Sequence, residues 1–205
     1  MNLANVPVYC IVLPGNSDNR IKRLLKEYGF KNIKIIPGVL EKKPRIGVAK
    51  AHLAALTLAL EETDGPFLIL EEDVDILHSV QDLFVPEDAD AIYLGVSRWG
   101  LRNGRGELNM ICGEKANGGL YRMYNMLAAH AVLYLDRDYA KFLINYIPMF
   151  INMQTNQDKL RAETMKYWNI YALNNPMFYQ RGRHEKNTKF KLSSQPMVSL
   201  GTYYL

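Results

Sequence analysis

The chain has 205 residues, of which 48% are hydrophobic and 22% charged, and its formal net charge is +4. This length suits one domain with a sizeable core, and the composition is ordinary for a globular protein, which excludes a low-complexity chain. No apolar run is long enough to span a membrane, and the first residues lack the charged-then-apolar pattern of a signal peptide, so we expect neither feature.

The charge and the cysteines narrow the functional classes further. A mildly positive net charge suits an anionic ligand but does not require that this ligand be a nucleic acid. Cys10 and Cys112 form no C-x-x-C pair, so neither a zinc ribbon nor a dithiol redox site is indicated. We expect a monomer in a reducing, cytoplasmic compartment, which is the host cytoplasm if the chain is viral.

The first third of the sequence predicts a strand–helix–strand unit. Residues 6–13 predict a buried strand, residues 20–28 an amphipathic helix, and residues 31–37 a second strand. Sheets of this α/β type bind nucleotides at the carboxyl ends of their strands. Leu13, Pro14 and Gly15 therefore lie where backbone could meet a base or ribose, and a plain connection explains them equally well.

A second helix is predicted over residues 47–62, where Val48, Leu53 and Leu56 have core spacing. Lys50 and His52 lie in its first turns. Lys50 could reach a phosphate if this helix begins near the strand ends, and a solvated lysine is the alternative. We expect His52 to be a partly buried structural residue.

Four acids follow the apolar run Phe67–Leu70, which has the length of a buried parallel strand. They are Glu71, Glu72, Asp73 and Asp75. Such dense negative charge favours a bound cation, and carboxylates suit Mg²⁺ or Mn²⁺, which take further ligands from substrate phosphates. The D-x-D patterns at residues 88–90 and 136–138 instead suit a turn and a helix cap. We therefore predict a metal–diphosphate site at residues 71–75, with a solvated acidic loop as the alternative.

The second half predicts further strands and helices. We expect strands at residues 91–96, 120–125, 126–135 and 169–173, and helices at residues 156–168 and 139–147, the latter ended by Pro148. Residues 97–115 read as a long substrate loop or lid. In the basic loop 181–187, Arg183 and Lys186 could bind a diphosphate and His184 could ligate the metal; a solvated basic tail is equally consistent.

The order of these segments resembles the glycosyltransferases of family 25, the lipooligosaccharide-biosynthesis type. The resemblance rests on Ala51-His52 in a helix, on the strand end Glu71-Glu72-Asp73-Val74, and on the alanine-rich strand from Ala128. The sequence is more similar still to the compact GT-A domain that large chlorella viruses encode. Residues 1–205 are then expected to form a single GT-A domain, the N-terminal module of a longer polypeptide.

The resemblance implies a Rossmann-like, mainly parallel mixed sheet flanked by helices, which binds a UDP-sugar with Mn²⁺ or Mg²⁺. Glu71 or Glu72 would hold the ribose, and Asp73 the metal, with Asp75 as a second candidate ligand. The register of the D-x-D motif stays open between Glu71/Asp73 and Asp73/Asp75. The chain is then expected to transfer a hexose, or a deoxyhexose such as rhamnose, to a glycan acceptor.

Asp158 matches an acid late in the family pattern and is our candidate general base, although a helix-surface aspartate is the plainer interpretation. Two other functions stay open. A sugar-1-phosphate nucleotidyltransferase also uses acids and a metal, but it needs a glycine-rich basic loop after the first strand. A nucleic-acid-binding module would use the basic loop, but it leaves the acidic strand end unexplained.

Overall fold

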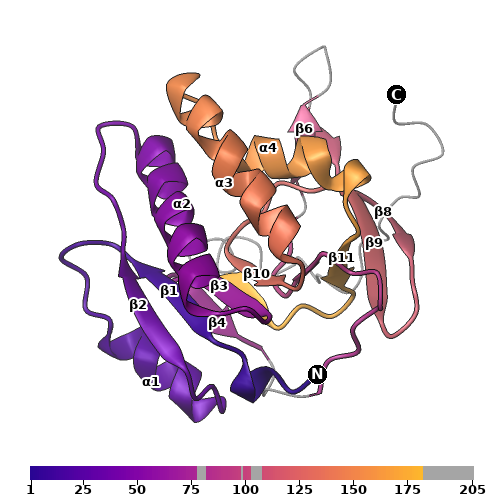
Figure 1. Ribbon diagram of the computed structural model, residues 1–205, viewed down its shortest axis with the longest axis horizontal. Coiled ribbons are helices and arrows are strands. Elements are labelled where there is room, and N and C mark those ends of the chain that lie inside the picture. The colour runs from indigo at the N-terminus through magenta and orange to yellow at the C-terminus, as the bar shows by residue number, and fades with distance from the viewer. Residues whose placement is uncertain (78–81, 98, 103–107, 182–205) are drawn as a thin grey trace.

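The computed structural model describes residues 1–77, 82–97, 99–102 and 108–181 (Figure 1). An eight-stranded mixed sheet forms its centre, with the strand order β2-β1-β3-β10-β5-β11-β9-β8. The pairings show that β9 and β10 run opposite to the other six strands. The expected mixed, mainly parallel sheet with flanking helices is therefore confirmed.

The N-terminal part of the chain builds the parallel end of this sheet. After the short 3-10 helix η1 (Leu3–Asn5), its elements are β1 (Val8–Val12), α1 (Asn19–Glu27), β2 (Ile33–Pro37), α2 (Pro44–Glu62) and β3 (Phe67–Glu71). β1 lies between β2 and β3 and is parallel to both. The chain thus leaves β1 for one neighbour and returns to the other side, so a topological switch point lies between the carboxyl ends of β1 and β3.

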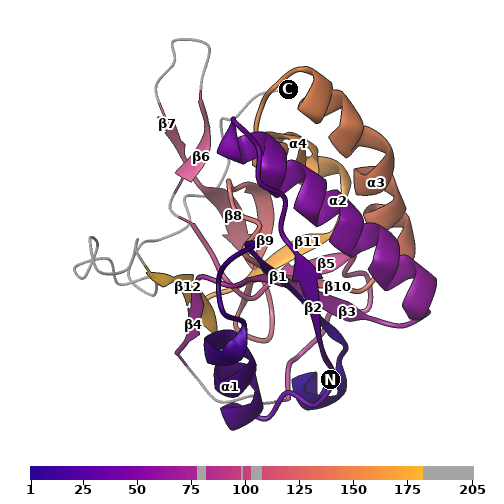
Figure 2. The same cartoon turned by 90° about the vertical axis from the view of Figure 1, so that its left-hand side faces the viewer.

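The helices lie on both faces of the sheet, as Figure 2 shows. Successive residues of β1 point to opposite faces. Tyr9 and Ile11 pack in the core beneath α2, whereas Cys10 packs in a second core with Ile21 and Leu25 of α1. Both faces of the parallel strands are therefore buried, which explains why these strands read as continuous apolar runs.

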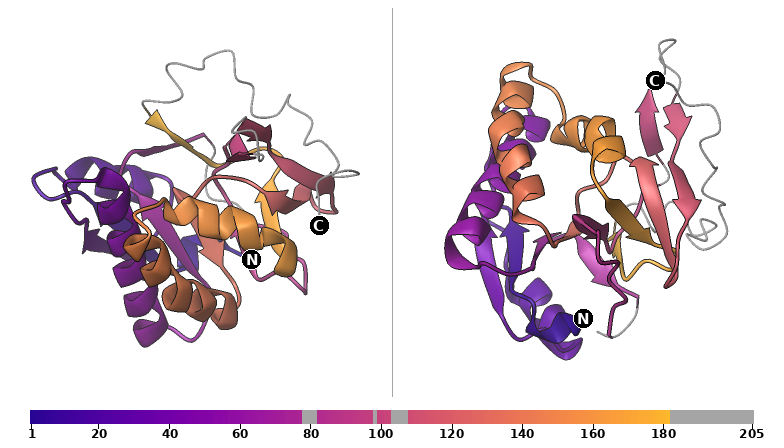
Figure 3. Two further views of the ribbon diagram at one scale, coloured as in Figure 1. Left: turned by 90° about the horizontal axis from the view of Figure 1, so that it is seen from above. Right: turned by 45° about the vertical axis from the view of Figure 1, so that its right-hand side comes forward.

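The remaining strands and helices complete the α2 side of the molecule. They are β5 (Ala91–Tyr93), β8 (Cys112–Lys115), β9 (Leu120–Asn125), β10 (Ala131–Tyr134), α3 (Arg137–Asn152), α4 (Gln157–Thr164), the 3-10 helix η2 (Met165–Tyr167) and β11 (Ile170–Leu173). Figure 3 shows α4 beside α3. Both contribute to the core that α2 covers.

Two small antiparallel pairs lie outside the main sheet: β4 (Val74–Ile76) with β12 (Phe178–Gln180), and β6 (Trp99–Arg102) with β7 (Leu108–Met110). Neither pair was expected. An irregular connection over residues 97–115 is therefore wrong, since β6, β7 and β8 occupy much of it, and its role as a substrate loop or lid stays a prediction. None of the described helices is both long and apolar enough to cross a membrane.

Several predicted element boundaries are also wrong: α2 begins earlier, at Pro44, β5 ends at Tyr93 and α4 ends at Thr164. Helix α3 continues through Pro148 to Asn152, because Ile147 and Phe150 anchor its turns on either side of the proline in the core. The strand expected at 126–135 is only Ala131–Tyr134. The residues expected before it are mostly buried, and the His130 carbonyl still accepts a hydrogen bond from the Glu71 backbone N–H of β3.

Candidate functional site

The acids of the 71–75 segment lie where the sequence placed them, at the carboxyl end of β3. This end adjoins the loop after β1, at the switch point of the sheet. In open α/β sheets, ligands bind in the crevice outside the strand ends at such a point. The four acids do not form one cluster, however, because they divide between two sets of partners.

Glu72 holds the loop after β1. Its Oε1 accepts hydrogen bonds from the Leu13 backbone N–H at 3.0 Å and from Asn16 Nδ2 at 2.8 Å. Pro14 and Gly15 are exposed beside this contact, and Gly15 has a φ of +89°, which a side chain would strain. The structure therefore brings the predicted Leu13–Gly15 loop and Glu72 together.

Asp75 lies in β4 and belongs to an ion-pair group. Its Oδ1 is 2.7 Å from an Arg20 guanidinium nitrogen, and its Oδ2 is 3.3 Å from Arg181 Nε. Arg20 also donates to the backbone carbonyls of Glu72 and Val74. Two arginines thus compensate Asp75, and its carboxylate fixes the segment to α1.

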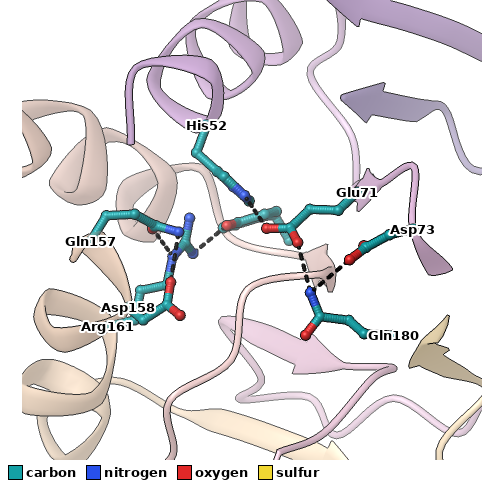
Figure 4. A network of polar contacts seen from close by, with 8 residues as sticks. His52, Glu71, Asp73, Gln157, Asp158, Arg161 and Gln180 are labelled. Atoms are coloured by element: carbon teal, nitrogen blue, oxygen red, sulfur yellow. Dashed lines mark hydrogen bonds and ion pairs between the residues drawn. The ribbon is translucent and has the colours of Figure 1, made fainter. Parts of the chain in front are cut away.

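Glu71 and Asp73 converge on one amide. Gln180 Nε2 donates to Glu71 Oε2 at 3.0 Å and to Asp73 Oδ2 at 3.3 Å (Figure 4). The short pairing of β4 with β12 brings Gln180 opposite Val74 and so places this amide between the acids. We refer to Glu71, Asp73 and Gln180 as the acidic pair and its bridging amide.

His52 of α2 contacts the same group. Its side chain is 1% exposed, and its Nε2 lies 3.0 Å from Glu71 Oε1, while Nδ1 has no hydrogen-bond partner among the described residues. The expected burial of His52 is confirmed. Its contact with Glu71 was not expected from the sequence, although α2 follows β2 and therefore begins at the carboxyl ends of the parallel strands.

The acidic pair offers the kind of ligands that Mg²⁺ or Mn²⁺ prefers. No group of three histidine, cysteine or acidic side chains in the described part of the chain could hold a metal alone. Such ions commonly use one or two carboxylates and take the rest from water and substrate phosphates. Glu71 and Asp73 already point at one small polar group, so the donor set fits a cation that a diphosphate shares.

Asp158 is not a free helix-surface residue. It lies half-buried in the first turn of α4, and its Oδ1 accepts a hydrogen bond from Gln157 Nε2 at 2.9 Å. Gln157 in turn accepts from Arg161 Nε at 2.6 Å, and Arg161 also donates to the Tyr134 hydroxyl. Burial raises the pKa of Tyr134, although the guanidinium opposes that rise, so the hydroxyl stays neutral.

The structure does not bring Lys50 to the acidic pair. Lys50 is exposed on α2 and forms an ion pair with Glu41. Arg183, His184 and Lys186 lie outside the described residues. Sequence reasoning missed four polar partners: Arg20, Gln157, Arg161 and Gln180. Only Gln157, next to Asp158, carried a local signal, because the others depend on long-range packing.

No family model and no curated protein matches this sequence. Among solved structures, the fold is similar to that of a glycosyltransferase involved in the glycosylation of the major capsid of PBCV-1. The two share 10% identity, with a TM-score of 0.54, over 91% of this chain and all of that one. A nucleoside-diphosphate-sugar pyrophosphorylase from Vibrio cholerae matches 94% of this chain and 82% of its own, at 13% identity and a TM-score of 0.49. The first likeness shows that this chain has a glycosyltransferase-like α/β fold.

Proposed function

We propose that this protein is a metal-dependent glycosyltransferase that moves a hexose or deoxyhexose from a UDP-sugar to a hydroxyl of a glycan acceptor. The observation that carries the proposal is the convergence of Glu71 and Asp73 on one amide beside the switch point of the sheet. The fold shared with a known glycosyltransferase supports it. UDP as the nucleotide and Mn²⁺ or Mg²⁺ as the metal are part of the proposal.

The division of the acids favours the Glu71/Asp73 register of the D-x-D motif. Asp75 is paired with two arginines, so recruiting it to a metal would break both ion pairs. Asp73 is exposed, and it shares the neutral Gln180 amide with Glu71, whose other carboxylate oxygen faces His52. Glu71 and Asp73 would therefore hold the cation once the Gln180 amide turns away or presents its oxygen.

The other residues would bind and orient the donor. Glu72 fixes the loop at residues 13–16, whose exposed backbone would lie against the base or ribose. Arg183 and Lys186 would add donors to the diphosphate, and His184 a further ligand to the cation. Lys50 would serve in this way only by leaving Glu41.

The chemistry needs charge stabilisation on one side of the sugar and a base on the other. A divalent cation, when bound, acts as a Lewis acid that stabilises the departing diphosphate. Glu71 and Asp73 would hold this cation, with His52 fixing the orientation of Glu71 from the core. Asp158 would accept the proton of the attacking hydroxyl.

Calorimetric titration of UDP and UDP-sugars, with Mn²⁺ and with EDTA, tests the proposal. We expect UDP to bind only when the metal is present, and Asp73→Ala to abolish this binding without unfolding the protein. A folded wild-type protein that binds no UDP with either metal would refute it. Turnover of a sugar phosphate with a nucleoside triphosphate would instead indicate a nucleotidyltransferase, and salt-sensitive binding of RNA or DNA a nucleic-acid-binding module.

A further inference from the structure

Arg161 is a buried charge without a direct counter-ion among the described residues. Its side chain is 0% exposed, and no carboxylate among the described residues lies within ion-pair distance of it. One terminal nitrogen lacks any hydrogen-bond partner in the described part of the chain. A buried charge without a direct counter-ion is costly, and an apolar side chain of similar volume is often at least as stable. Its position therefore points to a task beyond stability.

The guanidinium determines how the Gln157 amide is oriented. Arginine is only a donor, so the acceptor that faces its Nε at 2.6 Å must be the Gln157 oxygen. The amide nitrogen of Gln157 must then face Asp158, where it donates to Oδ1 at 2.9 Å. Gln157 is itself 1% exposed, so water does not compete for either bond. The orientation follows from chemistry and not from an arbitrary choice between the amide oxygen and nitrogen.

This chain of hydrogen bonds ends at Asp158, on the side of the sheet where the parallel strands have their carboxyl ends. β10 runs antiparallel to β3, so α3 begins near the amino end of β3 and runs back along the sheet. Helix α4 therefore begins near the carboxyl end of β3. The contact of Lys43, before α2, with Gln154, between α3 and α4, agrees with this. Figure 4 shows Asp158 in the same close view as the acidic pair.

We propose that Arg161 and Gln157 are positioning residues that keep Asp158 ionised and oriented as the general base for an inverting sugar transfer. The inference rests on the proposed function and deepens it. In this step the acceptor oxygen bonds to the anomeric carbon and its proton passes to the Asp158 carboxylate. The bond from that carbon to the diphosphate oxygen breaks, and its electron pair leaves with UDP.

The variant Gln157→Glu separates positioning from packing. Glutamate still accepts from Arg161 and adds a counter-charge to it, but it has no N–H for Asp158 and repels that carboxylate. A purely structural role therefore predicts unchanged turnover, whereas the positioning role predicts a loss in kcat. The matched control is Gln154→Glu, which makes the same chemical change at an exposed glutamine.

The experiment measures UDP release from a panel of UDP-hexoses with Mn²⁺ and water as acceptor, together with melting temperatures. We expect Gln157→Glu to melt near the wild-type temperature while its kcat falls at least about tenfold at unchanged KM. Asp158→Asn should lose about a hundredfold or more. The double variant should be no slower than Asp158→Asn alone, because both changes remove one function.

Two outcomes would overturn the inference in different ways. If Gln157→Glu keeps the wild-type kcat, or if its effect is undiminished in the Asp158→Asn background, the positioning role is wrong while the glycosyltransferase proposal stands. If the wild-type protein binds no UDP and releases none from any donor, the proposed function fails and the catalytic role of Asp158 fails with it.

Discussion

Two groups of polar residues near the carboxyl ends of the parallel strands differ in their exposure and in their hydrogen-bonding capacity. The acidic pair, Glu71 and Asp73, presents carboxylate acceptors at a half-exposed strand end, where a single neutral amide bridges them. The group around Arg161 is buried and rich in donors, and it directs an N–H at Asp158. The first group presents acceptors of the kind that suit a cation, whereas the second directs a donor at one anion.

This difference matches what the breaking of a bond between a sugar and a diphosphate requires. Negative charge that grows on the leaving diphosphate needs a positive partner, while the attacking hydroxyl needs an ionised base. A group that recruits a ligand must stay accessible, and a group that orients a base must stay rigid. Under the proposed function, the exposure of the first group and the burial of the second would have the same explanation.

The largest expected effect tests the rigid group. Arg161→Ala would leave the Tyr134 hydroxyl and the Gln157 oxygen without their donor and open a cavity in the core. We expect a loss of about 3 to 5 kcal/mol in the free energy of unfolding, measured by urea denaturation. Arg161→Met, which fills the volume, should lose much less. Equal losses for both variants would mean that the hydrogen bonds matter more than the cavity.

A smaller effect is expected from the accessible group, in binding and not in folding. Asp73→Asn removes a proposed metal ligand, and we expect UDP affinity in Mn²⁺ to fall about a hundredfold, or about 2.7 kcal/mol. Asp75→Asn is the matched control, because Asp75 is already paired with two arginines. Its UDP affinity should change less than about threefold in the same titration. A comparable loss for Asp75→Asn would move the motif to Asp73/Asp75, and an unchanged affinity for Asp73→Asn would contradict both registers.

A smaller effect, on the free energy of unfolding, is expected for Arg20, which binds the acidic segment from α1. Arg20 binds Asp75 and two backbone carbonyls, and its side chain is one-third exposed. Arg20→Ala should cost about 1 to 2 kcal/mol of unfolding free energy by thermal or urea denaturation. Arg23→Ala, on the same helix, removes only an exposed 3.6 Å ion pair with Glu27 and should stay within about 0.5 kcal/mol.

Much of this edge could be predicted from the sequence. The apolar run before Glu71 and the β1 pattern fixed the parallel strands, because continuous burial makes such strands readable. The acids then had to lie at the strand ends, next to Leu13. Their division between partners could not be predicted, since Gln180 and Arg181 arrive through the β4–β12 pair, about a hundred residues later in the chain.

The polar core was less predictable for a different reason. Residue pattern identifies the buried face of α4 but does not say which polar residue will occupy it, and Arg161 on a short helix looks like an exposed residue. The helix end predicted at Pro148 was wrong for the same reason. A proline normally ends a helix, yet the buried residues on both sides keep α3 continuous. In both places tertiary packing overrode a local preference.

The smallest expected effect, on stability, concerns an acid that precedes β5, at the amino ends of the parallel strands. Asp90 accepts a hydrogen bond from the Asn169 backbone N–H at 2.6 Å, and its burial raises its pKa above the usual value. A raised carboxyl pKa means that ionising Asp90 destabilises the fold. This cost is absent at low pH, where Asp90 is protonated, and is complete above the pKa of the folded state. Asp90→Asn keeps an acceptor and removes that cost, so it should stabilise the fold at pH 7 by less than about 1 kcal/mol. Denaturation curves at pH 7 and near pH 3 should show this gain shrinking as the pH falls. A gain that grows toward low pH would instead mean that the Asp90 charge stabilises the fold, and that the two edges of the sheet use their acids alike.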